Sequence, residues 1–218
     1  MNLNLSNPLE IIILLVVAGL LPYLAVLMSS FARIIIVLGL LRNALGLQTT
    51  PPNIVLNGLA LIVSIYIMNP VLTETYEAIQ YEDLSKITIQ TAPAFLEKIK
   101  PPFQKFLTAN SSPDTRQLFL SLARKTWPDQ RAATLTEQDM VILVPAFITT
   151  EVSLAFQIGF IIYLPFVIVD LVVSNILLAL GMVMISPTTI SLPFKLLLFT
   201  LVNGWGRLFE GLVLSYRY

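Results

Sequence analysis

Two carboxylates, Glu151 and Asp170, lie inside apolar stretches of this chain. An ionised carboxylate near the centre of a bilayer costs about 2.5–3.5 kcal/mol even on insertion scales, so each of them needs a partner or water. Two opposed aspartates around one water would carry out intramembrane aspartyl proteolysis. Asp170 has no second intramembrane aspartate and no flanking motif, which argues against that enzyme class.

Cations stand in or beside the same apolar stretches. Arg33 interrupts the first of them, where it either snorkels to a membrane interface or is buried and paired with Glu151 or Asp170. Lys195 stands directly before another apolar run, Leu196 to Val202. Ion pairing between helices is therefore one possible role for Glu151 and Asp170.

Two residue types are missing altogether, because the chain contains no histidine and no cysteine. This removes disulfides, thiol catalysis, Cys/His metal sites and the Ser-His-Asp arrangement. Thirteen basic and thirteen acidic residues cancel, so the chain offers no strong field to nucleic acid. We therefore expect no catalytic residue, no metal, no cofactor and no nucleic-acid partner.

A soft turn closes the most unusual apolar stretch, Phe166 to Pro187. Its first half carries Asp170 and Asn175, and it ends in Gly181-Met182-Val183-Met184. Methionine is unbranched and deformable, so Met182 and Met184 most simply fill gaps between helices.

The surrounding composition is that of a membrane protein. The chain has 218 residues, 56% hydrophobic and 12% charged, with a mean hydropathy of +0.81. A soluble domain carries about twice that charged fraction. No charge occurs between Glu10 and Arg33, between Arg42 and Glu74, or between Asp170 and Lys195. Each gap is long enough for a helix across a hydrocarbon core of roughly 30 Å, which needs about 20 residues.

The first apolar run extends from Ile11 to about Leu40. Ser6-Asn7-Pro8 is typical of a helix start, and Pro22 should kink or split the run. The beginning of the chain lacks the basic region of a cleavable signal peptide, so we expect the run to be retained as a helix.

The connection 41–53 contains Gly46, which can end a helix, and Pro51-Pro52, which can start the next. We expect Arg42 and Asn43 to fix this turn, and the positive-inside rule places it on the cytoplasmic side. The second run, Ile54 to about Leu72, should end or kink at Asn69-Pro70.

Residues 74–139 have a different composition, with eight of the thirteen basic and nine of the thirteen acidic residues. We expect a small water-facing helical segment. Prolines should divide it into short helices; these are Pro93, Pro101, Pro102, Pro113 and Pro128.

Two helix starts can be placed in this segment. Ser112-Pro113-Asp114 begins a helix whose buried stripe should contain Leu118, Leu122 and Phe119. Two capping-box patterns, Thr134 with Glu137 and Thr136 with Asp139, precede the next apolar run.

Met140 to Pro187 should form a hairpin of two kinked helices, with Pro145 as a kink and Pro165 at the passage between them. Its interior should hold four polar residues, Glu151, Gln157, Asp170 and Asn175. A last helix should follow to about Tyr216, loosened at Asn203–Arg207. The fold class is thus all-α, of integral-membrane type, in three segments: 1–73, 74–139 and 140–218. No internal repeat is present, which argues against a secondary transporter.

Three blocks resemble the FliP/SctR family, the export-gate proteins of bacterial flagella and virulence injectisomes. They are Ile34–Gly46 running into Pro51-Pro52-Asn53, then Ala155–Phe160 with Leu164–Val172, then Gly181–Met184 with Ile185–Lys195.

The resemblance implies a core subunit of the type III secretion export apparatus. Several copies would assemble with FliQ/SctS-like and FliR/SctT-like subunits into a helical cone, the entry channel for unfolded secreted substrates. FlhB/SctU-like and FlhA/SctV-like export components would be further partners. The location would be the bacterial inner membrane, multi-pass, with much of the assembly on the periplasmic side.

The resemblance also assigns residues. A methionine-rich loop that seals the channel maps onto Gly181, Met182, Val183 and Met184, and Val183 departs from the usual run of methionines. Glu151 and Asp170 would then either act as lumen charges or in proton coupling, or pair with Arg33, Lys195 or Arg207 across subunit interfaces. The charges expected in helix packing or at subunit interfaces are Arg33, Arg42, Glu151, Asp170 and Lys195.

The choice between the two systems rests on short segments. Lys125–Pro128 and Asn203–Gly206 look more like injectisome members, whereas Phe31–Leu38 looks more like flagellar ones. We favour the injectisome type, with a flagellar protein, or an unrelated polytopic transporter, as the alternatives.

Overall fold

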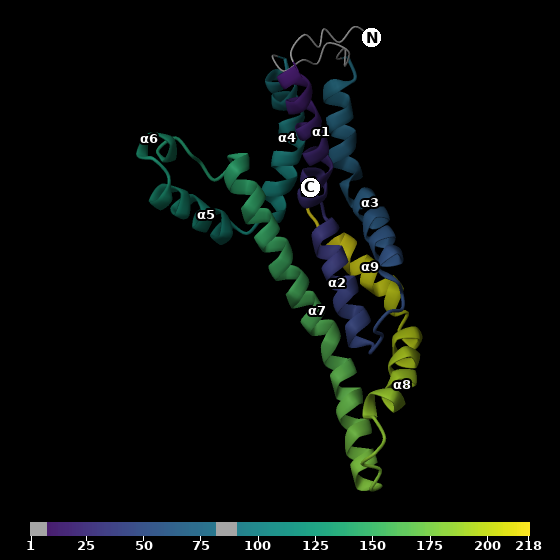
Figure 1. The fold of residues 1–218 in the computed structure, drawn as a ribbon. Helices are drawn as coiled ribbons and strands as arrows, with labels where there is room; N and C mark the ends of the chain where they lie inside the picture. Colours follow the sequence, from purple (N-terminus) through teal and green to yellow (C-terminus); the bar gives the residue numbers. More distant parts are fainter. Residues whose placement is uncertain (1–7, 82–90) are drawn as a thin grey trace. The chain divides into compact units, whose positions relative to one another are not determined.

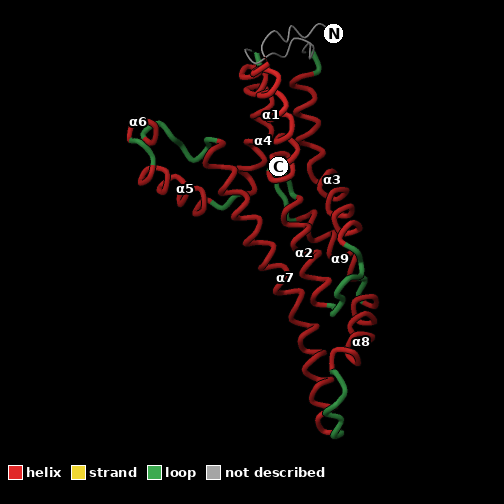
Figure 2. The backbone as a smooth tube through the Cα atoms, viewed as in Figure 1, coloured by secondary structure: helices red, strands yellow, loops and turns green. Residues whose placement is uncertain are grey.

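The computed structural model describes residues 8–81 and 91–218, and within these ranges the chain forms helices and no strand (Figure 1, Figure 2). The helices are α1 Pro8–Leu27, α2 Phe31–Ala44, α3 Asn53–Ile79, α4 Ala92–Asn110, α5 Pro113–Thr126, α6 Asp129–Ala132, α7 Met140–Ala179, α8 Pro187–Leu201 and α9 Gly204–Leu214. Helices α3 and α7 are long and apolar enough to cross a membrane, and the bent pair α8 and α9 would make a third span. The all-α, membrane-type class is confirmed.

The first apolar run is split after Leu27 and not at Pro22, and the alternative of a kink at Pro22 stays a prediction. Pro22 lies inside α1, which continues for another turn. At the break, the hydroxyl of Ser29 donates to the carbonyl oxygen of Val26 at 2.7 Å. Serine side chains compete in this way with helical hydrogen bonds, which explains why the helix ends here. The expected start at Ser6 and Asn7 lies outside the described residues.

Helix α3 continues past Asn69-Pro70 to Ile79, so the expectation that this pair ends it was wrong. The hydroxyl of Thr73 donates to the carbonyl oxygen of Asn69 at 2.9 Å, one turn back. Hydroxyls and local adjustments of this kind let an apolar helix tolerate a proline. The helix therefore crosses the expected boundary between residues 73 and 74, and the three-segment division stays a prediction.

The helices of the charged segment are longer than expected. Pro101 and Pro102 lie inside α4 and do not divide it. Helix α5 does begin at Pro113, as predicted, but Leu118 and Leu122 are exposed. The buried face instead contains Leu120 and Ala123, which pack on Ile142, with Phe119, Trp127 and Leu135 around them. The sequence pattern is ambiguous here because both faces of α5 carry large apolar residues.

Helix α7 runs unbroken for 40 residues, and the expected passage at Pro165 between two helices was wrong. It begins where the second capping pattern predicted, since Asp139 Oδ2 accepts from the backbone N–H of Thr136 at 2.7 Å. The hairpin exists, but its partners are α7 and α8. Of its four expected interior polar residues, Gln157 and Asn175 are exposed.

Two compact units can be distinguished. Unit one comprises residues 8–30, 66–81, 91–151 and 217–218, and unit two comprises residues 31–65 and 152–216. In unit one, the rings of Phe106 and Phe147 pack with centroids 5.7 Å apart. In unit two, a cluster of Leu41, Ala44, Leu45, Phe166 and Phe199 joins α2, α7 and α8.

Close backbone approach defines unit two further. A Cβ atom on Gly159 of α7 would overlap the end of the Leu40 side chain on α2, so the two helices approach closely there. Helices α8 and α9 meet at a bend of 60°. Asn203 adopts the left-handed conformation at this bend, φ 52°, where the sequence predicted a loosened helix.

Candidate gate loop and the buried charges behind it

The gate loop, Gly181–Met184, is held by the end of α7. Gly181 has φ +73°, a conformation that favours glycine. Its N–H donates to the carbonyl oxygen of Leu178 at 3.0 Å, and the N–H of Met182 donates to that of Leu177 at 2.9 Å. This hydrogen-bond pair is the Schellman helix stop, so the loop leaves α7 in a defined direction.

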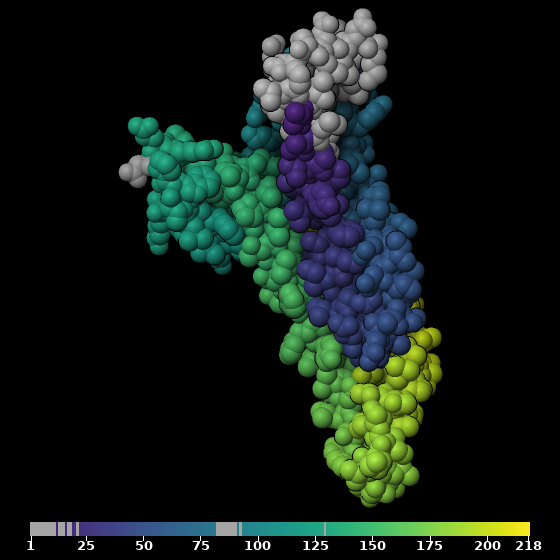
Figure 3. Space-filling view, in the orientation of Figure 1, coloured from purple at the N-terminus to yellow at the C-terminus, as the bar shows by residue number. Residues whose placement is uncertain are grey.

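The side chains of the gate loop are exposed, most of all that of Met184. Met182, Val183 and Met184 are 46%, 75% and 99% exposed. Figure 3 shows this end of the α7–α8 hairpin as the free tip of unit two. The chain itself therefore leaves most of the surface of Val183 and Met184 without packing contacts.

Behind the loop, Asp170 on α7 binds two residues of α8. Lys195 Nζ lies 2.6 Å from Asp170 Oδ2, and the hydroxyl of Ser191 donates to Oδ1 at 2.6 Å. Ser191 and Lys195 are buried, whereas the side chain of Asp170 is one-third exposed. Both oxygens of the carboxylate are thus occupied by donors, which is what a charge outside bulk water requires.

Lys195 has a third contact, at the end of α2. Its ammonium also donates to the carbonyl oxygen of Ala44 at 3.2 Å. The last carbonyls of a helix lack intrahelical donors and carry partial negative charge, so a cation is favourable there. One buried ammonium therefore joins α2, α7 and α8 within a single chain.

Arg33 is buried, so the snorkelling alternative was wrong. It donates from Nη1 to the hydroxyl of Ser215 at 2.7 Å, and its guanidinium lies 4.1 Å from the ring centre of Tyr216. Cations over aromatic faces are stabilised by the ring quadrupole. Arg33 thereby attaches α2 to the end of α9. The sequence also offered Asp170 as an acidic partner for Arg33, but the carboxylate of Asp170 is bound to Lys195.

Arg42 fixes the connection between α2 and α3. Its Nη1 donates to Asn53 Oδ1 at 2.7 Å and to the carbonyl oxygen of Pro51 at 3.2 Å. Gly46, φ +79°, ends α2 with the same Schellman pair that Gly181 makes, here to the carbonyls of Asn43 and Arg42.

Glu151 lies in unit one on α7 and is fully buried. Within unit two, the described contacts pair Asp170 with Lys195, and Arg33 and Arg42 bind at other junctions of that unit.

Sequence reasoning missed Ser191, Ser215 and Tyr216 as partners of these charges. Ser191 and Lys195 are four residues apart, which puts them on one face of a helix, and this spacing was a readable signal. The contacts of Arg33 join residues 182 positions apart and have no local signal.

Comparison with known proteins gives a family. The FliP family profile matches residues 14–212. The chain is 45% identical over 214 residues to Yop proteins translocation protein R of Yersinia pestis, covering 98% of this chain and 99% of that protein. It is 42% identical over 210 residues to hypersensitivity response secretion protein HrcR of Ralstonia nicotianae, covering 95% and 97%. It is 41% identical over 211 residues to virulence protein YscR of Salmonella typhimurium, covering 97% and 98%. The chain therefore belongs to the FliP family.

Proposed function

We propose that this chain is a core channel-forming subunit of the export apparatus of an injectisome-type type III secretion system. It passes unfolded proteins across the bacterial inner membrane and is not an enzyme. The support is the family and the names of its relatives, which refer to translocation, secretion and virulence. The apolar helices α3 and α7 are of the kind that such a location requires.

The gate loop is the part of the chain that we assign to closing this channel. The observation that carries the assignment is the nearly complete exposure of Met184, 99%, at the tip of a turn fixed by Gly181. Several copies around one axis would bring these tips together. Thioether side chains deform around a passing chain and pack again behind it, and a ring of them excludes water and ions by dewetting.

The length of α7 supports an assembly that rises out of the bilayer. Forty residues at 1.5 Å per residue give a helix of about 60 Å, roughly twice a hydrocarbon core of about 30 Å. Part of α7 must therefore lie outside the hydrocarbon, among protein or water. We propose that this part lies on the periplasmic side.

We propose that residues 74–139 are water-facing, because two of their ion pairs are on the surface. Lys105 lies 3.1 Å from Glu74 and Lys100 lies 3.3 Å from Glu97, with all four side chains about one-third exposed or more. The partners that fit the apolar helices are further copies of this chain with FliQ/SctS-like and FliR/SctT-like subunits. FlhB/SctU-like and FlhA/SctV-like components and the unfolded substrate complete the proposal.

Replacing Met182 and Met184 together with alanine tests the gate. We expect membranes that contain the assembled complex to become permeable to small solutes, because alanine side chains are too short to meet across the axis. The measurement is solute uptake, beside the mass of the extracted complex. The matched control replaces Met28 and Met140, which lie in unit one, and should leave permeability unchanged. Unchanged permeability with an intact complex would contradict the gate assignment.

Deleting the chain tests the role in secretion separately. We expect export of virulence proteins into the medium to stop and to return when the gene is supplied again. Loss of flagellin export with normal virulence-protein export would instead identify the flagellar system. Normal export of both would contradict the proposed function.

A further inference from the structure

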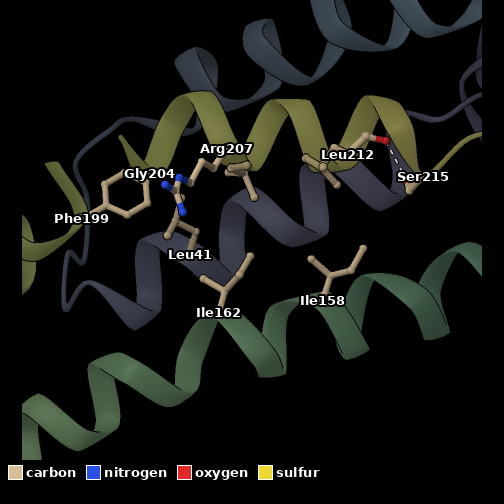
Figure 4. Close-up of a pocket in the computed structure, with 10 residues that line it drawn as sticks. Leu41, Ile158, Ile162, Phe199, Gly204, Arg207, Leu212 and Ser215 are labelled. Atoms are coloured by element: carbon tan, nitrogen blue, oxygen red, sulfur yellow. Dashed lines mark hydrogen bonds between the residues drawn. The ribbon is translucent and has the colours of Figure 1, made fainter. Parts of the chain in front are cut away.

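A cavity of about 420 Å³ lies within unit two, between α9 and the helices α2 and α7 (Figure 4). Its apolar wall consists of Leu41, Ile158, Ile162, Phe199, Leu208 and Leu212. A dry cavity of about 150 Å³ already accepts benzene, and ligand pockets begin near 300 Å³. The volume fits an alkyl chain.

One cation faces this apolar space. Figure 4 shows the guanidinium of Arg207 directed from α9 towards Leu41 and Phe199. Arg207 is exposed, so its guanidinium also reaches solvent, and among the described residues its side chain makes no hydrogen bond or ion pair. The other polar group in the wall, the hydroxyl of Ser215, is already used, because it accepts from Arg33 and donates to the carbonyl oxygen of Leu212 at 2.7 Å.

Unit two has more cationic than acidic residues. Unit two contains four cationic residues, Arg33, Arg42, Lys195 and Arg207, and two acidic ones, Asp170 and Glu210. Lys195 forms an ion pair with Asp170. Arg33 donates to Ser215, and Arg42 donates to Asn53. Arg207 is thus the cation for which the described part of the chain provides no counter-charge at the cavity.

We propose that this cavity binds one acyl chain of an anionic phospholipid, with its phosphate against Arg207. Arginine matches phosphate with two parallel N–H···O bonds, and basic pockets between membrane helices are where anionic lipid head groups bind. The lipid fills the space between α2, α7 and α9 that the chain leaves open. The inference goes beyond the secretion role and does not depend on it.

The chain contains its own probe for this lipid. Of its two tryptophans, Trp205 packs edge-on against Phe199 of the cavity wall, with ring centroids 5.3 Å apart. The full chain carrying Trp127→Phe is reconstituted in phosphatidylcholine vesicles with a small fraction of dibrominated phosphatidylglycerol or dibrominated phosphatidylcholine. Because a specific site fills by mass action, we expect the dibrominated phosphatidylglycerol to quench Trp205 fluorescence at least about twofold more than the dibrominated phosphatidylcholine.

Two variants separate specific binding from general lipid contact. Arg207→Gln should reduce quenching by phosphatidylglycerol to the level seen with phosphatidylcholine. Arg207→Lys should retain part of the excess quenching by phosphatidylglycerol. Gly211→Leu fills the cavity, since Gly211 lines it and a Cβ there meets no atom within 4 Å. This variant should fold with an unchanged or higher unfolding temperature and lose the excess quenching. Gly58→Leu is the matched control, on a helical glycine of α3 with equally open space.

Equal quenching of the parent chain by the two lipids would overturn the proposal and indicate that side chains of a second copy or another subunit fill the cavity. Excess quenching that persists in the folded Gly211→Leu variant would overturn it as well, because the lipid would then bind elsewhere near Trp205. Neither result bears on the export of proteins, which the deletion experiment measures.

Discussion

Lys195 is the residue on which three helices of unit two depend. Its ammonium is buried between the carboxylate of Asp170 on α7 and the carbonyl oxygen of Ala44 at the end of α2. A buried ion pair adds little over an apolar pair of equal volume, yet removal of one partner is costly because the other charge is left uncompensated. The pair therefore specifies the arrangement of these helices more than it stabilises them.

Replacing Lys195 with methionine should lower the free energy of unfolding by about 3 kcal/mol, because Asp170 loses its counter-charge. For a chain of this length, that corresponds to a fall of roughly 6–12 °C in the thermal midpoint of the detergent-solubilised protein. The double variant with Asp170→Asn should recover part of the loss.

Lys100→Met supplies the matched control for this prediction. Its ion pair with Glu97 is exposed, and pairs of that kind contribute about 0–1 kcal/mol. Equal falls in the thermal midpoint for Lys195→Met and Lys100→Met would show that the buried position of Lys195 has no special role.

At the scale of elements, the join between α8 and α9 is a fixed bend. Asn203 takes φ 52°, and a Cβ on Gly204 would overlap the ring of Phe199, so the backbone of α9 lies directly against that ring. Because Phe199 also packs on Phe166 of α7 and on Trp205, the bend is tied to the core of unit two. The break thus sets the direction in which α8 leads to the gate loop.

Substitution at Asn203 should reveal this conformation. L-residues other than asparagine, aspartate and glycine lose about 1–2 kcal/mol in the left-handed region, so Asn203→Val should lower the free energy of unfolding by that amount. Asn203→Gly should be neutral or stabilising. Asn175→Val, at an exposed helical position of α7, is the control. Thermal unfolding of the three variants distinguishes them, and a harmless Asn203→Val would mean that the bend does not persist in the membrane.

At the scale of the whole molecule, the sequence predicted what is locally encoded. Charge-free runs predicted the apolar helices. Gly46 predicted the end of α2, and Asp139 predicted the start of α7. The motif blocks predicted the family. Prolines misled, because the apolar helices continue through Pro22, Pro70 and Pro165.

The candidate site was predictable only in part, because its contacts join residues that are far apart in the sequence. Asp170 and Lys195 stood out because a charge in an apolar run needs a partner, but three cations were equally plausible partners for Asp170. Distance along the chain does not choose between them. The contacts of Lys195 with Ala44 and of Arg33 with Ser215 arise only when helices far apart in sequence pack together.

The hairpin of α7 and α8 makes the strongest demand for neighbours. Large apolar side chains face outward along it, including Phe160, Leu164, Leu171, Ile176 and Leu180. A helix that is apolar on all sides is stable only inside a larger protein or in lipid. Since α7, at about 60 Å, is roughly twice as long as a hydrocarbon core is thick, we expect further subunits to cover the part that lies outside it.

We therefore expect the detergent-extracted protein to have a mass of several 24.2 kDa chains, and more when the proposed FliQ/SctS-like and FliR/SctT-like subunits are produced with it. Leu171→Glu places an acid on the outward apolar face of α7 and should reduce this assembly, because the unpaired charge would have to be buried between subunits. Ala133→Glu, at an exposed position of the charged segment, should leave the mass unchanged. Native mass spectrometry measures all three. A strict monomer in every preparation would contradict a channel built from several copies, because a single hairpin tip has no counterpart against which Met184 could seal.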